Sequence, residues 1–550
     1  MSEGGLGAEE SISHVPKSTG MREIATLESM HDSSHARERL VGAALTAACF
    51  ALLAALVLGP SLHWGGMRKD ATPPASRVHT VYVTSGLTWS DITKDDTPAL
   101  WCFAENSGTA GLSLSSESVM PTKRQGLETL ATGTRTPALA SKSASGPDSK
   151  AGGKEFSDAS SALEEAGISL VDLGDVQTGD DVTRTEHERS VRAIDAAFAE
   201  HAGDCGERNI ALASVGSLNP SPGRAFEVEH TRGYDALPTP LNLQVYIDSR
   251  WGPAFLTSPS TRQVGVVMNL DLAASFVGKD QIGIGRAAVG TQAERGAQLA
   301  HARELTFASR ETEDSLAPML GVIIAVLLAS GLLARRFSAA QHVANVALLA
   351  IPVGYTSSIL PLGALVDLAI HPLFAIAGWT LLGTAILGAG LTWGAKLLGS
   401  ALPEQSRLLL TPALAALMTA AAILLDAALG SHASFTSLLG NQPIYGGRFY
   451  GLSNHITGIT LAAWALGAGM LMHALPIFST GRRPGLARVV FVGGSGAIVG
   501  LCSIAPSMGA DAGSALIYAP VTLVACLVLS GIRLRPWHVL AALISGLGVF

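Results

Sequence analysis

The residues best suited to binding a ligand are gathered around Arg448. Aromatic and polar side chains flank it at Tyr445, Phe449, Tyr450, Asn454 and His455, with glycines at positions 446, 447 and 451. A guanidinium presents paired donors to phosphate or carboxylate, aromatic faces suit a sugar or a lipid neck, and glycine permits close backbone approach. The cluster predicts a site for an anionic headgroup. The alternative is an aromatic belt at the membrane interface with one arginine reaching to the surface.

A second acidic position belongs to the same candidate site. Asp511 stands in Gly509-Ala510-Asp511-Ala512-Gly513 and is expected on the same face as Arg448, where it would pair with the arginine or mark a polar pathway. The alternative is a solvated loop carboxylate. Weaker candidates are ionisable or polar residues near the ends of apolar segments, where such groups are functional by default. They are Asp426, Asp367, His371, Asn345 and His342.

Long apolar segments must position this cluster. The chain has 550 residues, 48% of them hydrophobic, and a mean hydropathy of +0.35. Residues 40–58 form an apolar stretch of the length that a bilayer requires, so we expect a membrane anchor after a disordered cytoplasmic tail at 1–36. Residues 316–550 hold about eight more segments: 316–334, 343–362, 368–391, 408–429, 456–471, 489–504, 515–532 and 539–550. The last stops mid-span, which is expected of a longer chain.

Basic residues alternate between the loops and predict the topology. Most lie in every second loop: Arg335, Arg336, Lys396, Arg407, Arg482, Arg483, Arg488, Arg533 and Arg535. The intervening loops, at 363–371, 430–455 and 505–514, hold only Arg448. Because Lys and Arg are retained in the cytoplasm, the amino terminus is predicted to be cytoplasmic and residues 67–315 extracytoplasmic, in a multi-pass protein of the plasma membrane.

Residues 67–315 read as a soluble domain. Strands are expected at 78–83, 167–173 and 209–215, with helices from Pro98, capped by Thr97, and at 186–201. This alternation predicts an α/β sheet covered by helices. Residues 140–161, rich in Ser, Gly and Lys, predict a flexible loop. A disulfide between Cys102 and Cys205 is one alternative outside the cell, and two small buried thiols the other.

Several segments of this domain resemble the alkaline-phosphatase superfamily: 78–91, 97–101, 130–133, and 258–267 followed by Asp271-Leu272. The order of parts resembles a set of actinobacterial multi-pass membrane proteins whose helical half carries a GRFYG..N and a GADxG motif. Here these are residues 447–454 and 509–513. The resemblance implies an architecture and no particular activity.

The resemblance also implies that catalysis has been lost. Active members of that superfamily need an Asp after the first strand, a hydroxyl or thiol nucleophile at a helix start, and a Ser-Asp-His-Gly turn, because two metal ions must be held. Here the first position is Thr84 or Ser85, and the later turn reads Ala213-Ser214-Val215-Gly216. Thr122 lies near the nucleophile position without an evident activator. We therefore expect no metal, no cofactor and a degenerate domain, with Thr122 an ordinary loop residue.

The leading hypothesis is a cell-envelope protein that binds or transfers an anionic or lipid-linked component at its outer face, among membrane lipids. Arg448, Tyr450, Asn454 and Asp511 are its expected contacts. The alternatives are a transporter or flippase and, third, a metal-dependent phospho- or sulfo-hydrolase. A net charge of -7 without a basic run argues against nucleic acid as a partner.

Overall fold

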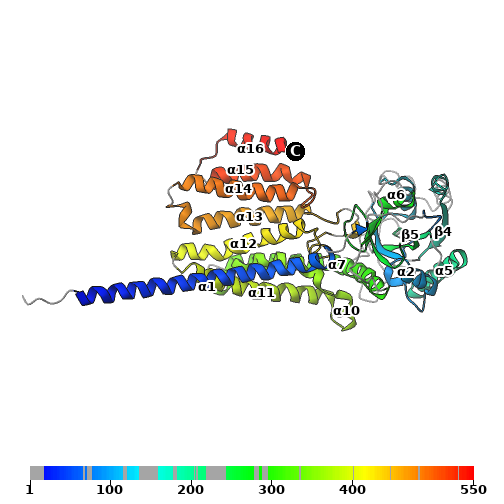
Figure 1. The fold of residues 1–550 in the computed structure, drawn as a ribbon, viewed down its shortest axis with the longest axis horizontal. Coiled ribbons are helices and arrows are strands. Elements are labelled where there is room, and N and C mark those ends of the chain that lie inside the picture. Colours follow the sequence, from blue (N-terminus) through cyan, green and yellow to red (C-terminus); the bar gives the residue numbers. More distant parts are fainter. Residues whose placement is uncertain are drawn as a thin grey trace, which may run out of the picture.

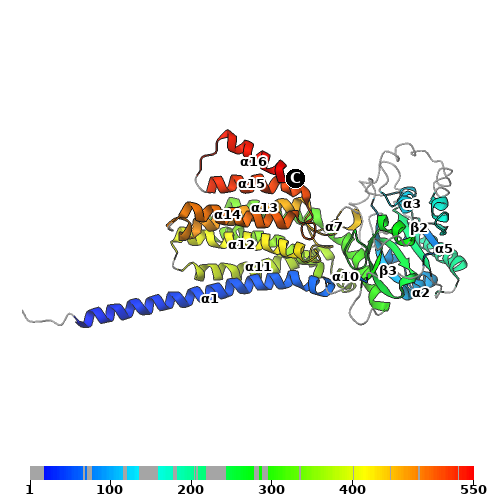
Figure 2. The same ribbon diagram turned by 45° about the horizontal axis from the view of Figure 1, so that its top comes forward.

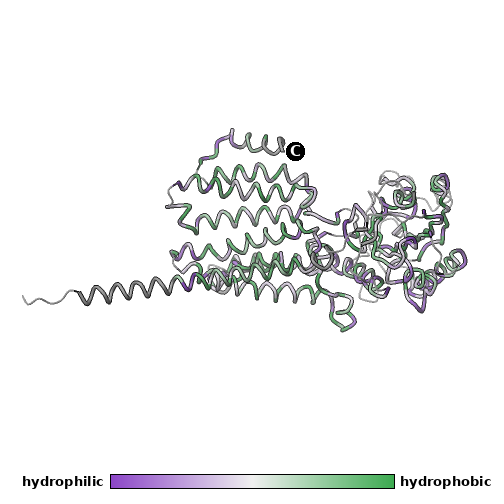
Figure 3. Tube along the Cα trace, in the orientation of Figure 1, coloured by the Kyte–Doolittle hydropathy of each residue, from purple (hydrophilic) through white to green (hydrophobic). Residues whose placement is uncertain are grey.

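The computed structural model describes residues 18–65, 69–70, 77–115, 121–134, 159–177, 182–203, 205, 209–217, 243–277, 284–287, 295–333, 336–400, 402–441, 443–445, 448–480, 483–529 and 532–549. An α/β domain lies at one end of a bundle of long helices (Figure 1). Hydrophobic residues run along the bundle helices, whereas the domain mixes both kinds (Figure 3). The predicted flexible loop at 140–161 falls largely outside the described residues.

The described strands of the domain form one mixed sheet of nine, in the order β1-β9-β7-β8-β3-β6-β5-β2-β4. β2 is parallel to β4 and β5, while β6 is antiparallel to β5 and β3. The bounds are β1 Lys69–Asp70, β2 Thr80–Ser85, β3 Gly108–Ser113, β4 Ser169–Asp175, β5 Ile210–Gly216, β6 Gln244–Asp248, β7 Ala254–Thr257, β8 Val266–Met268 and β9 Gly285–Ala287. The three predicted strands correspond to β2, β4 and β5.

Helices cover both faces of this sheet, as the alternating pattern predicted. One core holds Val81 and Val83 of β2 beneath α3 (Lys123–Thr132) and α6 (Leu272–Val277). The opposite core holds Tyr82 beneath α2 (Pro98–Asn106), α5 (Arg184–Ala202) and the start of α7 (Arg295–Leu333). Successive strand residues point to opposite faces, so a single strand supplies both cores and the domain has three layers.

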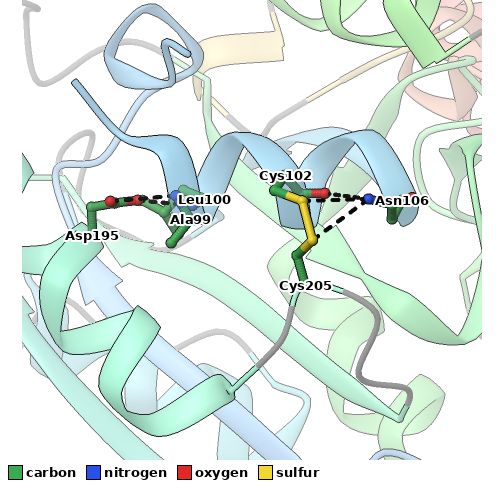
Figure 4. Close-up of a disulfide and its surroundings, with 6 residues drawn as sticks. All are labelled: Ala99, Leu100, Cys102, Asn106, Asp195 and Cys205. Atoms are coloured by element: carbon green, nitrogen blue, oxygen red, sulfur yellow. Dashed lines mark hydrogen bonds between the residues drawn. A yellow bond between two sulfur atoms is a disulfide. The ribbon is translucent and has the colours of Figure 1, made fainter. Parts of the chain in front are cut away.

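Two contacts fix α2 against its neighbours (Figure 4). Thr97 stands at the predicted helix start, but its side chain makes no cap bond. The carboxylate of Asp195 instead accepts hydrogen bonds from the backbone N–H of Leu100 at 2.8 Å and of Ala99 at 3.4 Å. One turn further on, Cys102 is disulfide-bonded to Cys205. The bonded alternative for the two cysteines is therefore the one found.

A single 39-residue helix, α7, joins the domain to the bundle. Its first turns belong to the domain, because Gln298 donates to the carbonyls of Ala104 and Ser107, at 2.9 and 3.0 Å. Its later turns carry Met319 into a cluster with residues of the bundle. The expected boundary between residues 315 and 316 therefore falls inside a continuous helix.

The remaining helices match the predicted apolar segments in order. They are α11 Pro372–Leu398, α12 Glu404–Ala428, α13 Asn454–Ala474, α14 Pro484–Ile504, α15 Ala515–Leu529 and α16 Pro536–Val549. The segment expected at 343–362 is broken into α8 Ser338–Val346, α9 Ala350–Tyr355 and α10 Leu362–Asp367, joined by 3-10 turns at Ala347–Leu349 and Thr356–Ile359. Among the described residues, seven helices are long and apolar enough to cross a membrane.

The first helix starts earlier than the sequence analysis expected. α1 spans Ser18–Gly65, so part of the tail expected to be disordered is helical. Positions 21–41 contain no Gly or Pro and are rich in Met, Glu, Arg, Ala and Leu, which favour helix. An apolar anchor that is already helical can extend such a segment without a new nucleation step.

The bundle presents three loops to the domain. We call residues 356–371, 429–453 and 505–514 the domain-facing loops. Two of these loops contact α7: the carbonyl of Thr436 accepts from the Thr312 hydroxyl at 2.8 Å, and the N–H of Gly363 donates to Glu304. In the third loop, the carbonyl of Pro506 accepts from Arg262 of the domain. Turning the view shows the same end of the bundle against the domain (Figure 2). These loops contain the segments that the charge pattern grouped on one side.

Candidate functional site

The loop between α12 and α13 carries Arg448 and is folded around a buried carboxylate. Asp426, at the end of α12, accepts from the backbone N–H of Ala433 at 2.8 Å and of Ser434 at 3.0 Å. The hydroxyl of Ser431 then accepts from the N–H of Gly451 at 2.7 Å. A buried carboxylate needs such donors. Asp426 therefore has a structural role, in contrast to the functional candidacy that its depth suggested.

The two sequence motifs of the helical half meet through their glycines. The N–H of Leu452 donates to the carbonyl of Gly509 at 2.8 Å. Gly451 has a φ of +79°, and a Cβ added there would lie 2.2 Å from that same oxygen. Only glycine permits both the left-handed backbone and this approach. The motifs at 447–454 and 509–513 are far apart in the sequence, and the structure brings them into contact.

Asp511 is buried rather than solvated. It is 6% exposed and accepts from the Thr457 hydroxyl at 2.7 Å. The carbonyl of Thr457 in turn accepts from the Tyr518 hydroxyl at 3.3 Å. Arg448 and Asp511, both described, form no ion pair, and Nη1 of Arg448 donates instead to the carbonyl of Leu452. Asp511 thus ties α13 to the neighbouring loop, and the expected pairing with Arg448 is wrong.

A second arginine, from the α/β domain, reaches the Arg448 loop. The guanidinium carbon of Arg262 lies 4.0 Å from the centre of the Tyr450 ring, which is cation–π distance. Arg262 is exposed and has a φ of +55°, unusual for a residue other than glycine. Its neighbour Gln263 donates to the carbonyls of Phe449 at 3.0 Å and Gly430 at 3.1 Å. Arg262 and Gln263 of the domain therefore both contact the loop that carries Arg448.

The other predicted positions are scattered. Asn454 is exposed at the first turn of α13, next to His455, which bonds the Leu439 carbonyl. His371 caps α11 by accepting from Leu373 N–H at 3.1 Å, and Asp367 ends α10. His342 is exposed and bonds the carbonyl of Ser338, while Asn345 is half-buried on α8. Of the four predicted contact residues, Tyr450 is the one that meets a charged side chain of the domain, Arg262. The sequence analysis missed Arg262 because its proximity to Tyr450 depends on tertiary packing.

At the carboxyl edge of the sheet a lysine stands between two carboxylates. Lys123 Nζ lies 2.5 Å from Asp172 and 2.8 Å from Asp175, and Ser85 donates to Asp175 at 2.6 Å. Thr122 caps α3 by accepting from the N–H of Gln125 at 3.3 Å. No group of three potential metal-ligating acids, histidines or cysteines occurs among the described residues. Lys123 supplies a single, fixed positive charge to these acids.

Together the domain, the seven apolar helices and the loops between them define a multi-pass membrane protein with an appended α/β domain. Comparison of the chain with protein-family models, with curated proteins and with solved structures finds no match. The function must therefore be argued from the residues themselves.

Proposed function

We propose that this protein binds or transfers an anionic, lipid-linked component of the cell envelope, at the junction between the α/β domain and the domain-facing loops. The contacts are Arg448 and Tyr450, as the sequence indicated, with Arg262 added from the domain. Asn454 stands at the margin of this site, whereas Asp511 supports it from within the bundle.

The observation that carries the proposal is the placement of Arg262 over Tyr450. Nη1 of Arg262 donates to the Pro506 carbonyl at 3.4 Å, but the guanidinium is exposed, and its carbon lies 4.0 Å from the centre of the Tyr450 ring. Its remaining donors can therefore reach a planar anion. Arg448 lies two residues before Tyr450 in the sequence and is half-buried. Two arginines from separate parts of the chain favour recognition of phosphate, for which bidentate guanidinium contacts are well suited.

Two features favour a plasma-membrane protein with the domain outside the cell. The disulfide between Cys102 and Cys205 is of the kind that persists in oxidising compartments. The basic loops lie at the ends of helices remote from the domain, which agrees with retention of Lys and Arg in the cytoplasm. Membrane lipids are then the immediate surroundings of the site.

The alternatives have less support. A transporter needs polar groups along a path through the bundle. The buried carboxylate of Asp426 already accepts hydrogen bonds from the N–H groups of Ala433 and Ser434, so it holds the loop rather than lining such a path. A metal-dependent hydrolase needs free carboxylates, and Asp172 and Asp175 are paired with Lys123. The likeness to alkaline-phosphatase-superfamily domains stays a prediction and includes no proposed activity.

The test is complementation of a strain that lacks the gene, with profiling of its envelope lipids and glycans. We expect Arg448→Lys and Arg262→Lys each to leave the altered profile uncorrected, because an ammonium keeps the charge but loses the planar fork. Membrane abundance should stay normal.

The matched control is Arg533→Lys, an exposed arginine at the end of the bundle away from the domain. It should restore the profile fully. Full restoration by both junction variants would contradict a bidentate anion site.

A further inference from the structure

A cavity of about 410 Å³ is lined in part by Gln263, the residue that also donates to the Phe449 carbonyl of the Arg448 loop. It is enclosed by Gln263 and Val264 of the domain, by α7, and by domain-facing loops around Ile359 and His432. Its volume falls in the range of small-molecule sites, about 300–1,000 Å³. Three separate parts of the chain thus surround one space.

The charged group in this cavity is a carboxylate. Glu304 is half-buried, and its oxygens accept from the Gly363 N–H at 3.1 and 3.0 Å. A Cβ at Gly363 would lie 2.4 Å from Oε2 of Glu304, so the glycine makes this approach feasible. No Lys or Arg lines the cavity, and among the described residues Glu304 makes no ion pair. The cavity therefore holds a carboxylate with no Lys or Arg beside it, and His301, which also lines the cavity, uses its Nε2 to bond the Val264 carbonyl at 3.3 Å.

A histidine adds a second acceptor. Nε2 of Gln263 donates to Gly430 and Phe449, so Oε1 of Gln263 is the atom facing Nδ1 of His432, at 3.0 Å. A carbonyl oxygen only accepts, which requires a proton on Nδ1. Burial lowers the pKa of His432 and favours the neutral ring. Nε2 of His432 is then the unprotonated nitrogen, which accepts a hydrogen bond.

Apart from His301, Ser358 and Thr436, the rest of the lining is apolar, and it lies next to the membrane-spanning helices. Leu305 and Ala308 follow Glu304 along α7, and Ile359 and Leu360 face them from the loop. Gly59, near the end of the α1 span, also borders the cavity. Ile359 is 39% exposed. An apolar wall at this level suits the first carbons of a lipid chain.

We propose that this cavity binds a membrane lipid whose headgroup carries a primary ammonium, with Glu304 as its counter-charge and His432 as a second acceptor. An ammonium offers three donors and no acceptor, which matches a carboxylate and an unprotonated imidazole nitrogen. The cavity is proposed to bind a cationic group, whereas the arginine site is proposed to bind an anion. The two are therefore separate sites, and this proposal does not depend on the first.

The test uses the full chain in nanodiscs of equal parts phosphatidylethanolamine and phosphatidylglycerol. Native mass spectrometry of the released protein measures the ratio of the two lipids retained. We expect the wild type to favour phosphatidylethanolamine. Glu304→Gln keeps an oxygen for the Gly363 N–H but removes the charge, and should reduce the ratio about ten-fold, the equivalent of about 1.4 kcal/mol.

Two further variants make the result decisive. Ala308→Phe fills the apolar wall and should abolish the preference while Glu304 stays in place. Asp314→Asn removes one negative charge from an exposed position on the same helix and should leave the ratio unchanged. Equal retention of the two lipids by the wild type, or an unchanged ratio in Glu304→Gln, would overturn the proposal. Arg448→Lys should not alter the ratio, which separates this site from the arginine site.

Discussion

The carboxyl edge of the sheet and the domain-facing loops both collect charged residues, but they use them differently. At the sheet edge Lys123 is paired with Asp172 and Asp175 inside the domain. At the junction Arg262 covers a tyrosine ring and stays exposed, and Glu304 has only backbone donors. Charge that is neutralised within the fold stabilises it, whereas charge left for an external partner indicates binding.

This difference favours the junction over the edge of the sheet as the place of function. The sheet edge, where a hydrolase would hold metals, is closed by its own ion pairs. The junction, which belongs to neither part alone, keeps groups of both signs available. Four changes test that division.

The largest effect is expected from Gly451→Ala. The added Cβ would meet the Gly509 carbonyl at 2.2 Å and force a φ of +79° on an L residue. The two costs together should lower the free energy of unfolding by about 3 kcal/mol or more. Thermal melting of the detergent-solubilised chain measures the effect. Gly458→Ala is the control, since a Cβ at Gly458 meets nothing within 4 Å. Equal melting of the two variants would show that the motif contact is unimportant.

Removing the disulfide should have the next largest effect, confined to the domain. Cys102 and Cys205 are separated by 103 residues, and loss of such a cross-link costs about 2–5 kcal/mol. Denaturation of the Cys102→Ala/Cys205→Ala protein should show an earlier domain transition with the bundle transition unchanged. Cys502→Ala, which removes a free thiol of the bundle, is the control. A shift of both transitions would mean that domain and bundle unfold as one unit.

Thr122→Ala distinguishes a helix cap from a nucleophile. The capping box formed with Gln125 predicts a loss of about 1 kcal/mol of domain stability. The envelope profile should be restored fully, because no chemistry is assigned to the hydroxyl. Thr134→Ala, at an exposed position, should leave the stability unchanged. A stable Thr122→Ala protein that fails to complement would place function at the sheet edge after all.

The smallest effect expected is a pH dependence from His187. Burial opposes its protonation, but the hydrogen bond at 2.9 Å and the charge of Asp91 outweigh burial and raise the pKa of His187. The contact between His187 and Asp91 therefore stabilises the folded domain fully below the ordinary histidine pKa of about 6.5. This stabilisation is lost as the pH rises through the pKa that His187 has in the folded protein. His187→Gln should destabilise the domain more at pH 5.5 than at pH 8.5.

Much of the architecture was predictable because it depends on local pattern. Apolar runs of membrane length and alternating basic loops are properties of contiguous sequence, so each predicted segment has a helical counterpart. The break near Ala347–Leu349 was missed, although Pro352 and Gly354 follow it closely. The start of α2 was predicted correctly, but the prediction that Thr97 caps it was wrong. The N–H groups of its first turn donate instead to Asp195, which belongs to another helix and could not be paired with α2 from the sequence.

The site was less predictable for the same reason. Arg448 and Tyr450 were found from their shared motif, but Arg262 reaches them only through folding. Asp511 was expected to pair with Arg448 or to mark a polar pathway, with a solvated carboxylate as the alternative, but it accepts from Thr457 of α13. Residues that a loop brings together from distant segments leave no periodic signal in the sequence.

The continuous helix α7 also has a mechanical consequence. At 1.5 Å per residue a helix of this length is about 58 Å long, and it enters both the domain core and the bundle without a hinge loop. Helices resist bending and twisting far better than loops do, and the internal Pro318 is where α7 would bend most readily. A force applied to the domain is therefore transmitted along α7 into the helical bundle.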